Sequence, residues 1–291
     1  NVTNIGESAF RGCTGLTGVT IPDSVISIGG YALDGCTGLT SVTIGSNVTS
    51  IGEGAFLYCT GLKEVIYNAK AAADLESYSE VFKDAGTAAD GMKVVFGESV
   101  EKIPAYLFKD CTGLTNVDIP DNVTVIGESA FDNCTGLKSV TIGSGVTTMG
   151  YSAFNGCTGL TEINYNAKRI EEVQHAFENA GTSSGGFDVV FGKNVEKIPD
   201  FIFYDCTGLT SVTIGSNVTN IGCGAFSGCT GLNSVEIPNS VTNIGGSAFQ
   251  GCTRLTSVGM PNSITCIEQY AFSGCTGLTS VTIPDSVTSI G

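Results

Sequence analysis

The segment Leu39–Cys59, LTSVTIGSNVTSIGEGAFLYC, carries the pattern that decides the fold of this chain. Val42 and Ile44 alternate with Thr43, and β-branched residues at a period of two favour a strand. Gly45 ends this apolar run, and other copies of the segment have a proline there, which cannot donate to a continuing strand ladder. We therefore predict a short strand that ends in a tight turn.

The remainder of the segment supplies the other apolar positions of one structural unit. Val48 and Ile51 form a second apolar step, and Ala55, Phe56 and Cys59 have the spacing of one short helical turn. A single unit of this size cannot bury all of these side chains, whereas neighbouring units stacked on one another can.

The cysteines show the period of the repeat. Ten of them recur at 23-residue intervals in three groups: Cys13, Cys36 and Cys59; Cys111, Cys134 and Cys157; Cys206, Cys229, Cys252 and Cys275. Each of the two longer gaps contains one degenerate unit, with Ala85 or Ala180 at the cysteine position. The chain therefore has about twelve units, and a period of this length is typical of a leucine-rich-repeat solenoid.

The repeat resembles the BspA-like leucine-rich repeats, whose unit L-x-x-V-x-I-P-x-x-V-x-x-I-x-x-x-A-F-x-x-C is matched by Leu39–Cys59. We predict an α/β repeat protein: one right-handed leucine-rich-repeat solenoid over residues 1–291, with longer, irregular units near 62–110 and 160–205. Parallel strands are expected on the concave side and short helical turns on the convex side. The resemblance implies an extracellular or cell-surface location, adhesion and protein binding, and it supplies no catalytic motif.

The two irregular units contain inserted residues over Ala69–Gly86 and Ala167–Gly181. Their apolar residues follow the spacing i, i+3, i+7: Leu75, Tyr78 and Phe82, and then Ile170, Val173 and Phe177. This spacing predicts that each unit has a true helix of about three turns on the convex side. The helices could form a protruding partner site, although tolerated insertion is the simpler interpretation.

Charge excludes two classes of partner. The chain has 28 acidic and 13 basic residues, a formal net charge of −15, so nucleic acid and anionic membrane surfaces are repelled. No apolar run approaches the roughly 20 residues that span a bilayer, and no leader segment is recognisable, so we expect no membrane insertion.

The candidates for chemistry are few. The repeated cysteine exchanges with alanine, which predicts a small buried group with no disulfide and no metal. His175 is the single histidine and is expected to be a solvated side chain on a polar helix. We therefore predict no catalytic residue, no cofactor and no metal site.

The outward positions of the predicted strands form two rows along the stack. Serine and threonine fill most of these positions on the strands near the two ends of the stack, whereas the central strands carry apolar and charged residues there. These central residues are the candidate partner-binding site: Glu64, Ile66, Lys93, Val95, Asn116, Asp118, Glu162 and Asn164. Exposed apolar groups rimmed by polar ones often mark a contact site, and the acidic charge favours a basic partner.

The leading hypothesis is a non-enzymatic adhesion or protein-binding domain whose partner is either a host or matrix protein or a glycan. The first alternative is a structural spacer within a larger surface protein, and a remote alternative is a carbohydrate-processing enzyme. The chain begins with NVTNIG and stops at SVTSIG in the same register, without polar capping units. We therefore expect the native protein to continue, or these ends to associate with each other.

Overall fold

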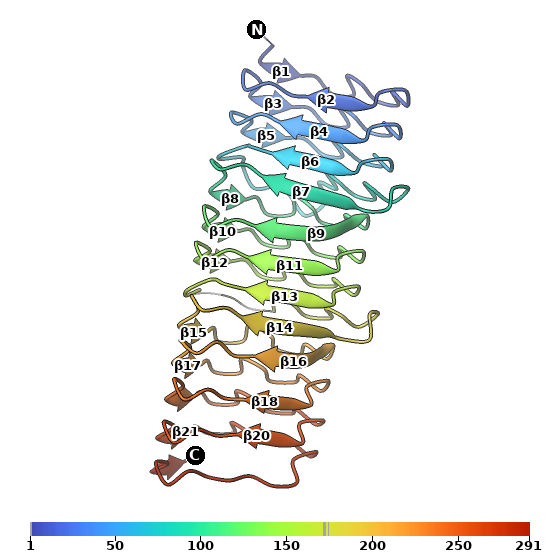
Figure 1. Ribbon diagram of the computed structural model, residues 1–291. Helices are drawn as coiled ribbons and strands as arrows, with labels where there is room; N and C mark the ends of the chain where they lie inside the picture. Colours follow the sequence, from blue (N-terminus) through green and yellow to red (C-terminus); the bar gives the residue numbers. More distant parts are fainter. Residues whose placement is uncertain (1, 171–172, 174) are drawn as a thin grey trace.

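The chain winds into a parallel β-solenoid with about one coil for each sequence unit, and the coils stack into a long column (Figure 1). The structure is a computed structural model that describes residues 2–170, 173 and 175–291. The two chain ends lie at opposite ends of the column.

An eleven-stranded parallel sheet runs along one side of the column. Its strands, in spatial order, are β2 (Gly18–Thr20), β4 (Ser41–Ile44), β6 (Glu64–Tyr67), β7 (Met92–Phe96), β9 (Leu114–Ile119), β11 (Ser139–Ile142), β13 (Glu162–Tyr165), β14 (Phe187–Phe191), β16 (Leu209–Thr213), β18 (Ser234–Glu236) and β20 (Ser257–Gly259). The pairing of Val42 with Val65 and of Thr43 with Ile66 confirms the predicted strand and its register from unit to unit.

The second apolar step also forms strands, each two residues long and paired with the same step in neighbouring units. Three small parallel sheets result: β1 (Asn4–Ile5), β3 (Ser27–Ile28) and β5 (Ser50–Ile51); β8 (Lys102–Ile103), β10 (Val125–Ile126) and β12 (Thr148–Met149); β15 (Lys197–Ile198), β17 (Asn220–Ile221), β19 (Asn243–Ile244), β21 (Cys266–Ile267) and β22 (Ser289–Ile290).

A stack of phenylalanine rings runs through the core. Neighbouring ring centroids are 4.8–5.9 Å apart along the series Phe56, Phe82, Phe108, Phe131, Phe154, Phe177, Phe203, Phe226, Phe249 and Phe272. Because Phe82 and Phe177 belong to this stack, the alignment of the two degenerate units with the regular repeat is confirmed.

The prediction of short helical turns on the side opposite the main sheet is wrong. The sixth unit shows the observed arrangement. The amides of Ser129 and Phe131 donate to the carbonyls of Tyr151 and Ala153 in the next coil, at 2.9 and 2.8 Å. The alternate residues instead close tight turns, as when Asp132 N donates to Ser129 O at 3.1 Å. This side of the column is therefore a ladder of linked turns, which we call the turn face.

Left-handed backbone explains why the described residues of the turn face form no helix. In the sixth unit Ser129 has φ 48° and Asn133 has φ 57°, and an L-residue in that conformation every four residues cannot belong to an α-helix. The sequence contains a signal for the second of these positions. Glycine, asparagine or aspartate stands there in eleven units: Gly12, Gly35, Asp84, Asp110, Asn133, Gly156, Asn179, Asp205, Gly228, Gly251 and Gly274.

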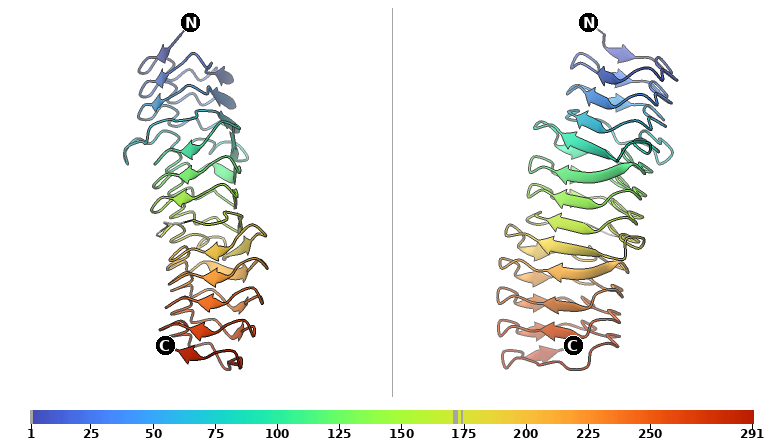
Figure 2. Two further views of the ribbon diagram at one scale, coloured as in Figure 1. Left: turned by 90° about the vertical axis from the view of Figure 1, so that its left-hand side faces the viewer. Right: turned by 45° about the vertical axis from the view of Figure 1, so that its right-hand side comes forward.

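The predicted helix over Ala69–Gly86 is also wrong. The inserted residues form a loop that projects from the column, coloured teal in Figure 2, and Tyr78 is 65% exposed. Several loop amides bond to other coils, since Ala73 N donates to Thr49 O at 2.9 Å and Leu75 N to Ala105 O at 3.3 Å. A helix would use these amides in its own hydrogen bonds.

The predicted helix over Ala167–Gly181 is wrong for the residues that the structure describes there; residues 171, 172 and 174 lie outside them. His175 has a left-handed φ of 51°, and Ala180 N donates to Phe177 O at 3.1 Å in the same type of turn as the regular units. Ile170 and Val173 are buried because they pack into the core. Their helical spacing therefore reflects core packing.

Candidate functional site

All eight candidate residues lie on the outer face of the main sheet, which we call the sheet face. Their places are Glu64 and Ile66 on β6, Lys93 and Val95 on β7, Asn116 and Asp118 on β9, Glu162 and Asn164 on β13. The paired register puts them in two neighbouring rows across consecutive strands, with β11 between β9 and β13. Inward neighbours on the same strands fill the core, so all eight side chains are at least partly exposed.

The strands β6 to β9 form the first part of this site. Lys93 Nζ lies 2.8 Å from Glu64 Oε1, which holds two long side chains across the strand pair. Val95 is 43% exposed beside Ile66, an unusual position for an apolar side chain on a row rich in threonine. A hollow of about 630 Å³ opens here, lined by Lys93, Val94, Val95, Phe96, Asn116, Asp118, Pro120 and Ser139.

A β-bulge shapes this hollow. The register between β7 and β9 shifts after Met92, so that Thr115 has no partner of its own. Gly91 leads into the bulge with φ 110°, and a Cβ there would lie 2.3 Å from Thr115 Cγ2, so another residue type would be strained and crowded. Bulges re-aim the neighbouring side chains and are common beside functional sites.

The second irregular unit repeats this construction. The register between β14 and β16 shifts after Phe187, and Gly186 has φ 118° with Thr210 Cγ2 at 2.3 Å from a Cβ position. Asp188 and Val190 occupy the places of Lys93 and Val95, and Val190 is 37% exposed. The candidate list omitted these two residues, although the repeated sequence VVFG followed by VEKIP marks the equivalence.

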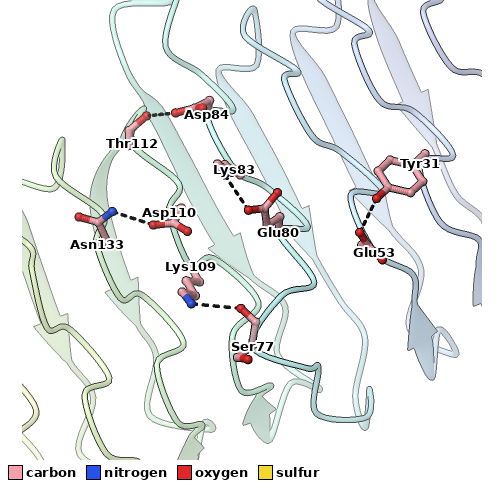
Figure 3. Close-up of polar contacts among 10 residues, drawn as sticks. All are labelled: Tyr31, Glu53, Ser77, Glu80, Lys83, Asp84, Lys109, Asp110, Thr112 and Asn133. Atoms are coloured by element: carbon pink, nitrogen blue, oxygen red, sulfur yellow. Dashed lines mark hydrogen bonds and ion pairs between the residues drawn. The ribbon is translucent and has the colours of Figure 1, made fainter.

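Several charged side chains of the turn face near the first irregular unit are hydrogen-bonded to polar groups of other residues (Figure 3). Asn133 Nδ2 donates to Asp110 Oδ1 at 2.7 Å, and Thr112 Oγ1 donates to Asp84 Oδ1 at 2.8 Å, each between two adjacent coils. Tyr31 likewise donates to Glu53 of the next coil. These contacts hold neighbouring coils together, so this face performs a structural task.

His175 does not lie on a helix and is only partly solvated. Its ring is half-buried on the turn face, with centroids 5.5 Å from Tyr151 and 5.2 Å from Tyr204. Its Nδ1 atom lies 3.4 Å from Glu178 Oε2. Phe201 extends this group of aromatic rings, with its centroid 6.1 Å from that of Tyr204.

The repeated thiols belong to the core. Nine of the ten are buried, while Cys13 in the first coil is exposed. Several donate to the carbonyl of the preceding coil's stacking residue, as when Cys134 Sγ lies 3.1 Å from Phe108 O. Burial raises the pKa of Cys59 and of Cys252 to about 12, so both thiols are protonated and unreactive at neutral pH.

A stack of short parallel strands with a sequence repeat of 23 residues places the chain in the class of leucine-rich-repeat solenoids. The family model of the BspA type leucine rich repeat region matches residues 1–87, 78–185 and 186–291, with six copies. The chain therefore belongs to the BspA type leucine-rich repeat family.

Two solved structures are similar to this chain. A leucine-rich repeat protein from Bacteroides ovatus is 28% identical with a TM-score of 0.53, over 96% of this chain and 81% of that one. A leucine rich cell surface protein from Faecalibacterium prausnitzii is 28% identical with a TM-score of 0.43, over 99% and 82% of the two chains. A comparison with curated proteins finds no match. Within the described part of the chain, no helix has the length and apolar character to cross a bilayer.

Proposed function

We propose that this chain is a non-enzymatic protein-binding domain that acts in adhesion at the cell surface, and that its partner docks on the sheet face. The observation that carries the proposal is the half-exposed Val95, which lines a hollow in the sheet face together with Lys93 and Asp118. An apolar side chain left open among charged ones gains free energy when a partner covers it.

The construction of the sheet supports this role. Every strand between the edge strands β2 and β20 is hydrogen-bonded to two neighbours, so the side chains on the central part of the sheet face are held in place before binding. A preorganised surface loses little conformational entropy on association. The surface location is proposed from the family and from the resemblance to the Faecalibacterium prausnitzii cell surface protein.

The test is a pair of double variants with the same change in charge. Ile66→Arg with Val95→Arg alters the proposed contact, whereas Thr20→Arg with Gly259→Arg places two arginines on exposed positions of the same row, outside it. Binding to immobilised, purified matrix proteins and to a glycan array would be measured for the parent protein and both variants.

We expect at least one protein ligand, a loss of binding of tenfold or more for the first variant, and a change of less than twofold for the second. If no ligand binds the parent protein, the spacer function replaces the proposal. A spacer is the second candidate because equivalent residues recur on strands near the ends of the sheet, as in Thr20 and Thr43 or Ser234 and Ser257. Turnover of an arrayed glycan would instead support the remote enzymatic alternative.

A further inference from the structure

The two irregular units are copies of one module. The first reads EVIYNAK from Glu64 and the second EINYNAK from Glu162, and each continues into a strand containing VVF and then the sequence VEKIP. The strands β6 and β7 of the first copy therefore correspond to β13 and β14 of the second. Two equivalent positions on the sheet face, Val95 and Val190, are exposed valines.

The valines are separated along the column by four strand spacings, from β7 through β9, β11 and β13 to β14. At about 4.8 Å for each spacing, this separation is roughly 19 Å. The row between them holds Asp118, Thr141 and Asn164, which are polar. The sheet face thus has an exposed valine at each end of a row of three polar residues, and we call this row the interval.

The interval and the neighbouring row carry three carboxylates, those of Asp118, Glu162 and Asp188. Asp118, Glu162 and Asp188 have no ion-pair partner among the described residues, although Glu162 accepts from Asn164 Nδ2 and Asp188 from Thr210 Oγ1. Glu162 and Asp188 are directly opposed on neighbouring strands, which is unfavourable for two like charges. In the first copy the residue opposite Glu64 is Lys93, and the two form an ion pair. A cation supplied from outside would complete the same arrangement in the second copy.

We infer that the strip formed by Val95, Asp118, Glu162, Asp188 and Val190 binds an extended, basic segment of a partner protein, laid along the column and across the strands. This inference rests on the proposed function and adds the chemistry of the partner. An extended chain advances about 3.3 Å for each residue, so about six residues span the distance between the valines. Its apolar side chains meet Val95 and Val190, and lysines or arginines between them meet the carboxylates.

Synthetic peptides test this arrangement directly. The peptide SLTKSKTLS has leucines six residues apart and lysines between them, all on one side of an extended chain. The peptide SKTLSLTKS has the same composition with the leucines and lysines exchanged, and SLTESETLS replaces the lysines by glutamates. Fluorescence anisotropy with labelled peptides at 20 mM NaCl measures the three dissociation constants.

We expect the first peptide to bind at least tenfold more tightly than the other two, and its affinity to fall as salt rises to about 0.3 M because the charges are screened. The double variant Val95→Arg with Val190→Arg should lose that affinity. Thr20→Arg with Gly259→Arg, which adds the same charge, should keep it within twofold. Thermal melting monitored by circular dichroism checks that both variants are folded.

Equal binding of the first two peptides, or no measurable binding of the first peptide at 1 mM, overturns the inference. The proposed function is judged separately, by the loss of the immobilised ligand in the variant Ile66→Arg with Val95→Arg. The variant Ile66→Arg with Val95→Arg could lose the immobilised ligand while the first two peptides bind equally. That result would support binding at the sheet face and would reject a basic segment that contacts both valines.

Discussion

Lys93 and Glu64 form an ion pair across β7 and β6 at 2.8 Å, whereas the equivalent strands β14 and β13 oppose the carboxylates of Asp188 and Glu162. One structural module therefore has an attractive pair in its first copy and a repulsive pair in its second. The side chains of the first pair are partly exposed, so solvent screens the interaction and its contribution to stability is small.

This contrast predicts the effect of one substitution. Asp188→Lys should raise the free energy of unfolding by about 0.5 kcal/mol, because it replaces an opposed like-charge pair by an exposed ion pair. Lys93→Asp should lower the free energy of unfolding by a similar amount. Urea unfolding at low salt and at about 1 M NaCl measures both, and the two effects should shrink at high salt. Effects that persist unchanged at high salt would contradict this electrostatic origin.

The phenylalanine stack predicts that the free energy of unfolding depends on the size of the side chain at its centre. Phe131 is fully buried between Phe108 and Phe154, with centroid distances of 5.4 and 4.9 Å. Phe131→Ala should lower the free energy of unfolding by about 3–5 kcal/mol through the cavity it leaves. Phe131→Leu should lower it by about 1 kcal/mol, since the second unit already has Leu33 at this position. Urea titration followed by circular dichroism distinguishes the two values, and equal losses would show that ring stacking itself is required.

Two buried tyrosines predict a gain in stability. Tyr67 and Tyr165 occupy equivalent positions, and neither hydroxyl has a hydrogen-bond partner among the described residues. Burial raises the pKa of both hydroxyls, which are therefore neutral. Tyr67→Phe should raise the free energy of unfolding by about 1 kcal/mol, because it removes a buried unpaired polar group.

Tyr31→Phe is the matched control, since its hydroxyl donates to Glu53 on the surface and its removal should bring no gain. Thermal melting compares the two variants. A less stable Tyr67→Phe variant would show that a buried water satisfies the hydroxyl.

The buried thiols predict a loss of stability in alkali. An unfolded cysteine ionises near pH 8.5, whereas the folded pKa of Cys59 and of Cys252 is about 12. Below pH 8.5 both states hold the proton and the free energy of unfolding is unaffected. Above that pH the unfolded state loses protons that the folded state retains, so each thiol lowers the stability by about 1.4 kcal/mol per pH unit up to about pH 12.

Urea unfolding from pH 8 to pH 11 measures this slope. The double variant Cys59→Ala with Cys252→Ala should reduce it by about 2.7 kcal/mol per pH unit, and alanine fits because Ala85 and Ala180 occupy the same position in other units. An unchanged slope would show that these two thiols ionise in the folded protein.

The candidate site could be located from the sequence only in part. The strand alternation around Thr43 placed Ile66 and Lys93 on the correct face, because side-chain direction in a strand depends on position alone. The bulge at Thr115 changes the surface between β7 and β9, and it depends on the contact between Gly91 and a residue of the next coil. No local pattern contains that contact.

The sequence by itself determined the number of coils, their register and the residues that face the core, because a period of 23 residues allows each apolar position to be covered only by its equivalent in the next unit. Tertiary structure decided the hydrogen bonding of the turn face and the conformation of the insertions. The spacing of Ala55, Phe56 and Cys59 suits a helix, but Phe56 N donates to Val81 O of the following coil at 2.9 Å. In a helix, the backbone amides donate their hydrogen bonds within the helix itself. In a stacked coil, half of them donate to the neighbouring coil, so the conformation depends on residues that are distant in the sequence.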